Sequence, residues 1–160
     1  MMKKNLASLF TLVLTVFILL SGCKKEETPQ EEEEQPANEV IIEYDGQKLT
    51  YYSYSFLYVM GKVYIHTDLV GELQVEISFP KDAEEGQTYT DMSKFSVTGF
   101  DANGDIVFST GYDASNFEFN LTRNDAENKW YTGNFQFDYD NDYSQVSYHI
   151  EGSFDVQNPH

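Results

Sequence analysis

From Val40 onward, apolar and polar residues alternate with a period of two in one short run after another. The clearest runs lie at 73–79, 117–122, 135–139 and 146–156. Successive side chains of a β-strand point to opposite faces, so this alternation is typical of strands with one face buried and one face in water. No segment after residue 22 shows the period of an amphipathic helix. We therefore expect the folded part of the chain to be all-β.

Turn-forming sequences separate these runs, for example at 101–104, 124–125 and 140–142. Short strands joined by turns predict a single domain at 39–160, an antiparallel β-sandwich of about eight or nine strands. A lipocalin-like β-barrel is the alternative. Phe, Tyr and Trp make up 16 % of the chain, which is enough to fill a sizeable core. A longer stretch at 80–89 interrupts the series and is predicted to cross from one sheet to the other.

The first hairpin also has a predicted register. Asp45 and Gly46 stand between two alternating runs, and an Asp-Gly pair suits a two-residue hairpin turn. Such a turn places Glu43 opposite Lys48, and the apolar neighbours of these two residues opposite each other.

The start of the chain has the features of a secretory signal peptide at 1–22. Lys3 and Lys4 precede an apolar run at 6–20, which is shorter than the roughly 20 residues of a membrane-spanning helix. Residues 20–23 read LSGC and resemble the lipobox of bacterial lipoproteins. The resemblance implies that the peptide is cut before Cys23 and that Cys23 is acylated on its sulfur and on its new amino terminus.

Residues 23–38 are expected to form a lipidated, disordered acidic tether. The stretch 24–38 holds six glutamates, two prolines and no aliphatic residue larger than alanine, so it cannot bury enough surface to fold. Its start, KKEE at 24–27, is similar to the acidic export signals of Bacteroidota surface lipoproteins, although a second lysine delays the acidic pair by one position. The resemblance implies a protein anchored to the outer membrane through lipid and exposed at the cell surface.

The charge of the β domain limits its partners. From Glu39 onward the chain has 6 basic and 21 acidic residues, a net charge of −15. Nucleic acid and anionic lipid headgroups are poor partners for such a surface. Cys23 is the only cysteine, so we expect no disulfide.

Glycines beside aromatic residues provide a second resemblance. The segments 86–90, 130–137 and 150–156 are similar to small Bacteroidota lipoproteins of unknown function, in which a "G-x-F-x-F" strand precedes a terminal "I-x-x-G-x-F" strand. The match covers roughly the last 75 residues and implies a fold and a location, but no activity.

A row of aromatic residues is the first candidate binding site. Tyr52, Tyr54, Phe56 and Tyr58 fall on one face if 51–58 is a strand. Flat rings with hydroxyl groups can stack on sugars, so Tyr52, Tyr54 and Tyr58 are candidate glycan-binding residues. Tyrosine is equally common in strands that cover a core, and this alternative stays open.

Three aspartates form a candidate calcium site. Asp138, Asp140 and Asp142 have the one-three-five spacing of carboxylates in calcium loops. An EF-hand is excluded, because the positions that require glycine and glutamate are Tyr143 and His149. The alternative is an acidic turn with no metal, and we expect no other cofactor.

The sequence favours a non-catalytic binding or accessory module at the outer membrane, with a glycan or a surface protein as its ligand. It contains no G-x-S-x-G elbow, phosphate loop or H-E-x-x-H motif. One alternative is a small hydrolase that uses carboxylates such as Glu151 and Asp155. Another is a structural or adhesion module stabilised by calcium.

Overall fold

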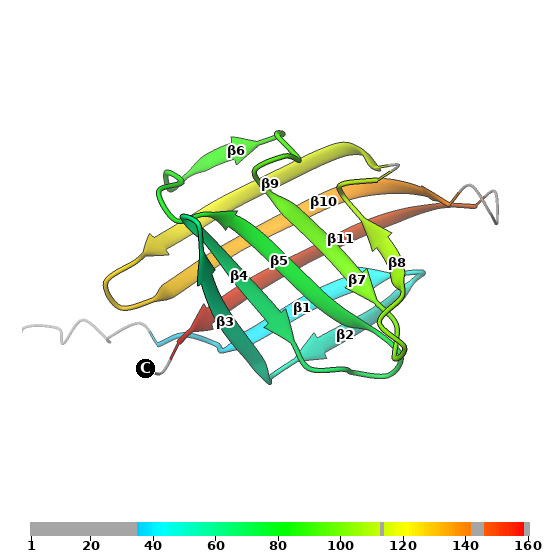
Figure 1. The fold of residues 1–160 in the computed structure, drawn as a ribbon, viewed down its shortest axis with the longest axis horizontal. Helices are drawn as coiled ribbons and strands as arrows, with labels where there is room; N and C mark the ends of the chain where they lie inside the picture. The colour runs from blue at the N-terminus through cyan, green and yellow to red at the C-terminus, as the bar shows by residue number, and fades with distance from the viewer. Residues whose placement is uncertain (1–34, 113, 142–145, 159–160) are drawn as a thin grey trace, which may run out of the picture. The chain divides into compact units, whose positions relative to one another are not determined.

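Eleven β-strands in two antiparallel sheets make up the described part of the chain (Figure 1). The structure is a computed structural model that describes residues 35–112, 114–141 and 146–158. No helix occurs in these ranges, and therefore none that is long and apolar enough to cross a membrane. The expectations for the signal peptide, Cys23, most of the tether and Asp142 fall outside the described residues.

The larger sheet has six strands in the order β2-β1-β11-β10-β9-β6. Their bounds are Gln47–Tyr51 for β2, Glu39–Tyr44 for β1, Val146–Gln157 for β11, Trp130–Asn141 for β10, Ala114–Asp125 for β9 and Gln87–Tyr89 for β6. The three longest strands of the described residues, β9, β10 and β11, lie side by side in this sheet (Figure 1).

The smaller sheet has five strands in the order β3-β4-β5-β7-β8. Their bounds are Tyr54–Val59 for β3, Lys62–Thr67 for β4, Gln74–Pro80 for β5, Ser96–Phe100 for β7 and Ile106–Ser109 for β8. Its strands cross over those of the larger sheet in Figure 1. The sheets are not closed into a barrel, so the predicted β-sandwich is confirmed.

The core lies between the two sheets and follows from the alternation in the sequence. In β4, for example, Val63, Ile65 and Thr67 are buried, whereas the residues between them are half-buried on the outer face. Every apolar side chain of the core cluster lies between Val40 and Val156. A chain that begins at Gln35 therefore contains the whole of this core, and these residues form one compact unit. We expect such a chain to fold by itself.

The first hairpin has the predicted register. Glu43 pairs with Lys48 and Ile42 pairs with Leu49. The turn residues Asp45 and Gly46 have φ angles of 51° and 69°, and a type I′ turn requires positive φ at both central positions.

The two glycine–aromatic motifs pair with each other in β10 and β11. Gly133 lies opposite Phe154, and Phe135 lies opposite Gly152. Each phenylalanine ring occupies the space that a side chain of the facing glycine would fill. The motifs are thus two halves of one packing arrangement in the core.

The stretch 80–89 crosses between the sheets, as predicted. The chain leaves β5, adds β6 to the edge of the larger sheet and returns to the smaller sheet as β7. The connections from β2 to β3 and from β8 to β9 also change sheets, and the sequence did not indicate them. The structure has more strands than the eight or nine expected, because β6 and β8, of three and four residues, are too short to show a clear alternation.

Candidate functional site on the outer face of the larger sheet

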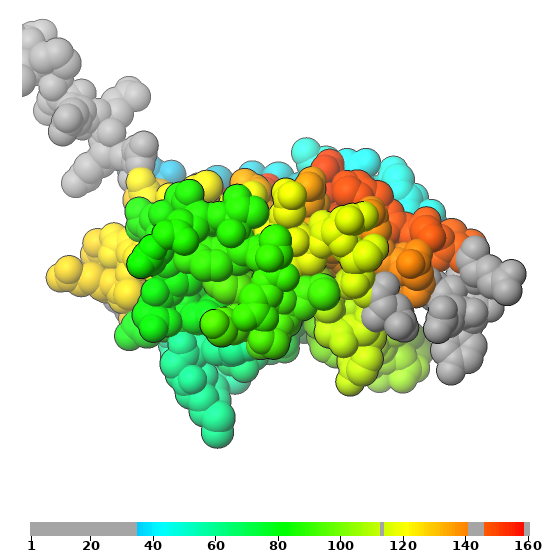
Figure 2. Space-filling view, turned by 90° about the horizontal axis from the view of Figure 1, so that it is seen from above, coloured from blue at the N-terminus to red at the C-terminus, as the bar shows by residue number. Residues whose placement is uncertain are grey.

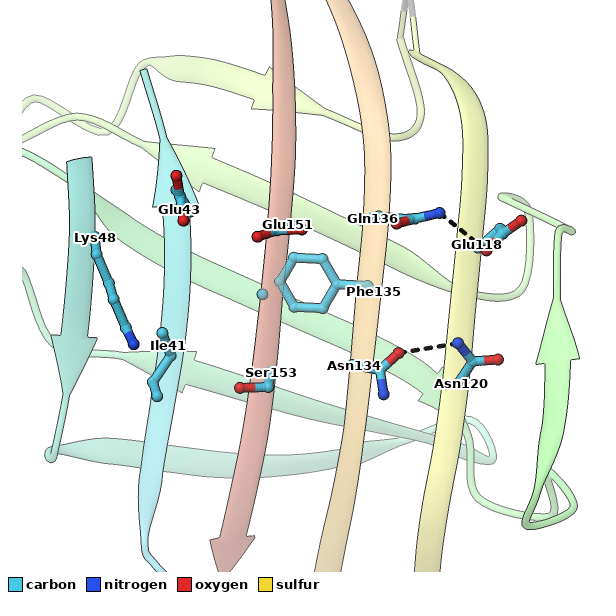
Figure 3. Close-up of a pocket in the computed structure, with 11 residues that line it drawn as sticks. Ile41, Glu43, Lys48, Glu118, Asn120, Asn134, Phe135, Gln136, Glu151 and Ser153 are labelled. Carbon is cyan, nitrogen blue, oxygen red and sulfur yellow. Dashed lines mark hydrogen bonds between the residues drawn. The ribbon is translucent and has the colours of Figure 1, made fainter. Parts of the chain in front are cut away.

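The outer face of the six-stranded sheet carries a shallow, open depression of about 380 Å³ (Figure 3). Its lining comes from β2, β1, β11, β10 and β9, so it spans most of the sheet. Most of the lining side chains are polar and point away from the core. They are Ile41, Glu43, Lys48, Glu118, Asn120, Asn134, Phe135, Gln136, Glu151, Gly152 and Ser153.

Strand register brings five of these residues into one row across the sheet. Lys48 pairs with Glu43, Glu43 with Glu151, Glu151 with Gln136, and Gln136 with Glu118. We call this set the charged row. Glu43 and Glu151 are directly opposite each other, and like charges in such a pair are destabilising. The charged row therefore gives the depression an excess of negative charge.

A second row runs parallel to the first and is uncharged. We call it the neutral row, and in sheet order it comprises Thr50, Ile41, Ser153, Asn134, Asn120 and Thr88. Ile41, Ser153 and Asn134 of this row line the depression together with the charged row (Figure 3).

Hydrogen bonds orient the amide groups on one side of the depression. Gln136 Nε2 donates to Glu118 Oε2 at 3.0 Å, and Asn120 Nδ2 donates to Asn134 Oδ1 at 2.9 Å (Figure 3). Thr88 Oγ1 in turn donates to Asn120 Oδ1 at 2.5 Å. These groups are held in fixed orientations before any ligand arrives, which lowers the entropic cost of binding.

A second depression of about 380 Å³ adjoins the first, and Glu43 and Glu151 line both. His149 lies in this second depression. Its Nδ1 is 2.7 Å from Asp138 Oδ1, and its Nε2 is 4.0 Å from Glu151 Oε2. The polar surface therefore continues along β11 beyond the charged row.

Two of the three aspartates of the candidate calcium site, Asp138 and Asp140, have partners within the sheet. Asn116 Nδ2 donates to Asp138 Oδ2 at 2.6 Å, and hydrogen bonds from Asn116 and His149 hold the pKa of Asp138 below its usual value. Asp140 accepts a hydrogen bond from Ser147. Across the ranges that the structure describes, no group of three or more His, Cys, Asp or Glu side chains could hold a metal ion. Asp142 lies outside those ranges.

The aromatic row is only partly assembled. Tyr54, Phe56 and Tyr58 lie on one face of β3, as predicted. The centroid of the Phe56 ring lies 5.5 Å from that of Tyr54 and 6.2 Å from that of Tyr58. Phe56 also lies 6.0 Å from the buried ring of Tyr131. Tyr52 precedes the strand and is 73 % exposed. Tyr54 and Phe56 thus pack against the core, Tyr58 at the end of their row is 39 % exposed, and Tyr52 is not part of the row.

The two carboxylates of the alternative hydrolase, Glu151 and Asp155, both belong to β11 but lie at different positions along the strand. Glu151 lines the depression. Asp155 accepts hydrogen bonds from Trp130 Nε1 at 2.6 Å and from the Ala37 amide at 3.0 Å, which occupy its carboxylate oxygens. Only Glu151 of this pair therefore belongs to the site.

Most residues of the charged and neutral rows were not predicted as site residues. The alternation assigns them to solvent faces, but it does not say which strands are neighbours. The pairing of β1 with β11, of β11 with β10 and of β10 with β9 brings these side chains together. Comparison with protein-family models and with curated proteins finds no match for this chain.

Proposed function

We propose that this protein is a lipid-anchored protein of the bacterial cell envelope whose β-sandwich binds a glycan without catalysing a reaction on it. The binding surface of this proposal is the depression over the charged and neutral rows. The observation that carries it is the row of oriented amides and carboxylates across an open sheet face (Figure 3). The anchor of the proposal is Cys23, because of the lipobox at 20–23.

The chemistry of the two rows fits a neutral, hydroxyl-rich ligand. Sugar hydroxyl groups both donate and accept hydrogen bonds, so they can donate to carboxylate oxygens and accept from amide N–H groups. An acidic polysaccharide would be repelled by Glu43, Glu118 and Glu151. We therefore expect neutral glycans to bind and uronic-acid polymers not to bind.

Binding is expected to depend on the charged row. Glu151→Ala removes an acceptor from the middle of the row. It should lower the affinity for a glycan about tenfold, since a hydrogen bond to a charged group contributes about 1.5 kcal/mol or more. A glycan array with the chain from Gln35 identifies the ligand, and calorimetry measures the affinity.

Glu127→Ala is the matched control, because it changes the charge equally at an exposed position in the turn after β9. It should leave the affinity unchanged. Equal effects of the two substitutions would contradict the assignment of the site, and hydrolysis of the bound glycan would favour the hydrolase.

The anchor is tested separately. Cys23→Ala removes the sulfur to which lipid is attached in the proposal, and several acyl chains on one residue are what hold such a protein at a bilayer. We expect the variant to move from the membrane fraction to the soluble fraction when cells are fractionated, with Ser21→Ala as a control that keeps the cysteine. Unchanged partitioning of the Cys23 variant would rule the anchor out.

A further inference from the structure

The smaller sheet ends at β3, and no strand of the described residues pairs with the outer edge of β3. An open edge presents unpaired N–H and C=O groups to any extended chain that can align with it. Natural proteins usually protect such edges with charged side chains, with proline or by keeping the strand short.

The other three edge strands have such protection, and β3 does not. β2 carries Lys48, β6 has three residues, and β8 has four residues next to a register shift at Phe100. β3 has six residues and contains no Asp, Glu, Lys, Arg or proline. It is the longest edge strand of the described fold and the least protected.

The end of β3 is also apolar and exposed. Leu57 is 51 %, Tyr58 39 % and Val59 38 % exposed, and Met60 in the following turn is fully exposed. Figure 2 shows the hairpin of β3 and β4 projecting from the body of the domain. Large apolar side chains gathered on a projecting edge are typical of an interaction surface.

The turn at the tip supports the same conclusion. Met60 and Gly61 have φ angles of 51° and 80°, so they form the same kind of turn as Asp45 and Gly46. Asn, Asp or Gly is favoured at the first of these positions, because other side chains are strained at positive φ. The β3–β4 turn instead carries an exposed methionine, which does not help the isolated domain to fold.

We propose that β3 pairs antiparallel with β3 of a second copy of this chain, across a twofold axis that passes through Leu57. This axis places Leu57 opposite the partner's Leu57 and Phe56 opposite the partner's Tyr58. It also brings Met60 opposite the partner's Tyr54. The two strand pairs each point to one face of the joined sheet, as antiparallel pairing requires, and Met60, which is fully exposed in the turn, gains a neighbour.

A second copy fits this edge for reasons of symmetry and charge. A twofold axis brings the donors and acceptors of a strand to the acceptors and donors of the same strand, so the edge is complementary to itself. The domain carries a net charge of −15, with 6 basic and 21 acidic residues from Glu39 onward, and most faces would bring carboxylates together. β3 contains no charged residue, so two copies can meet along this edge without bringing like charges together.

One strand pair buries less surface than the roughly 1,200 Å² of a typical stable interface, so we expect a reversible dimer with a dissociation constant of about 10 μM to 1 mM. Sedimentation velocity of the chain from Gln35, over about 1 μM to 2 mM, should show a monomer that becomes a dimer as the concentration rises. Leu57→Lys places two lysines opposite each other and should weaken the dimer at least tenfold. Ile106→Lys, at a 52 % exposed position on the other edge of this sheet, should not.

Cysteine cross-linking tests the register. Leu57→Cys should form an intermolecular disulfide in high yield under mild oxidation of the chain from Gln35, which lacks Cys23. Ser55→Cys should not, because Ser55 faces the partner's Val59 in this register. Circular dichroism checks that each variant is folded.

Three results would each overturn the proposal. They are a monomer at every concentration, equal weakening by the two lysine substitutions, and equal cross-linking of the two cysteine variants. Vesicles of neutral or anionic lipid test a membrane contact in the same way. If the monomer binds these vesicles and Met60→Asn abolishes that binding, the tip is a membrane contact and not a dimer interface.

Discussion

Gly152→Ala is expected to lower the free energy of unfolding by about 3 kcal/mol, an unusually large effect for one methyl group. A Cβ atom at this position would lie 2.5 Å from the Ile41 carbonyl oxygen and 2.5 Å from Cζ of Phe135. Well-packed interiors have no room for such contacts, so the strand and the ring would both have to move. Because Ile41 contributes a backbone atom, a change of side-chain rotamer cannot relieve the clash.

Urea unfolding of the chain from Gln35 measures this loss. Gly111→Ala is the matched control, because a Cβ atom there would meet only Ser109 Oγ at an ordinary 3.6 Å. Combining Gly152→Ala with Phe135→Leu should recover part of the loss, since the shorter side chain vacates the space beside residue 152. Equal destabilisation by the two glycine substitutions would show that the packing of Phe135 on Gly152 is not the cause.

This packing arrangement illustrates how far the sequence could be interpreted. The motifs around Gly133 and Gly152 are visible in the sequence, and the alternation correctly assigns Phe135 and Phe154 to strand faces. Their pairing depends on the register of β10 against β11, which the alternation does not fix. A register shifted by two residues keeps every side chain on the same face but separates each glycine from its phenylalanine.

Local signals predicted local structure well. The Asp-Gly turn gave the pairing of Glu43 with Lys48, because a two-residue turn leaves only one register. The row of Tyr54, Phe56 and Tyr58 was also predicted correctly from the period of a strand. Whether that row faces a core or a ligand depends on what packs against β3, and in the structure this is Tyr131, more than seventy residues away.

The candidate site could not be predicted because it is assembled from distant parts of the chain. Glu43 and Glu151 belong to the first and the last strand, and they become neighbours only when β1 joins β11. The pairing of strands that are far apart in the chain leaves no periodic pattern in the sequence. Polar residues on a solvent face also look alike in sequence, whether they line a depression or only face water.

The domain is expected to lose stability at high pH. Tyr51 and Tyr131 are fully buried, and burial raises the pKa of Tyr51 from its ordinary value of 10.0 to about 12. Burial, with a further contribution from Tyr58, also raises the pKa of Tyr131 well above its ordinary range. Above about pH 10 the unfolded chain loses these protons, whereas the folded chain keeps them. The contribution of the two tyrosines to the free energy of unfolding is therefore fully present below about pH 10, and it is lost as the pH rises toward their pKa values in the folded state.

The expected loss is about 1.4 kcal/mol per pH unit for each tyrosine between about pH 10 and pH 12, or nearly 3 kcal/mol per unit for the pair. Urea unfolding at intervals over this range measures the slope. Tyr131→Phe should roughly halve the slope, because one buried group no longer ionises. Tyr52→Phe should leave the slope unchanged, since Tyr52 is 73 % exposed and folding does not bury its ring. Equal slopes for the wild-type chain and for Tyr131→Phe would mean that the alkaline transition has a cause other than the buried hydroxyl of Tyr131.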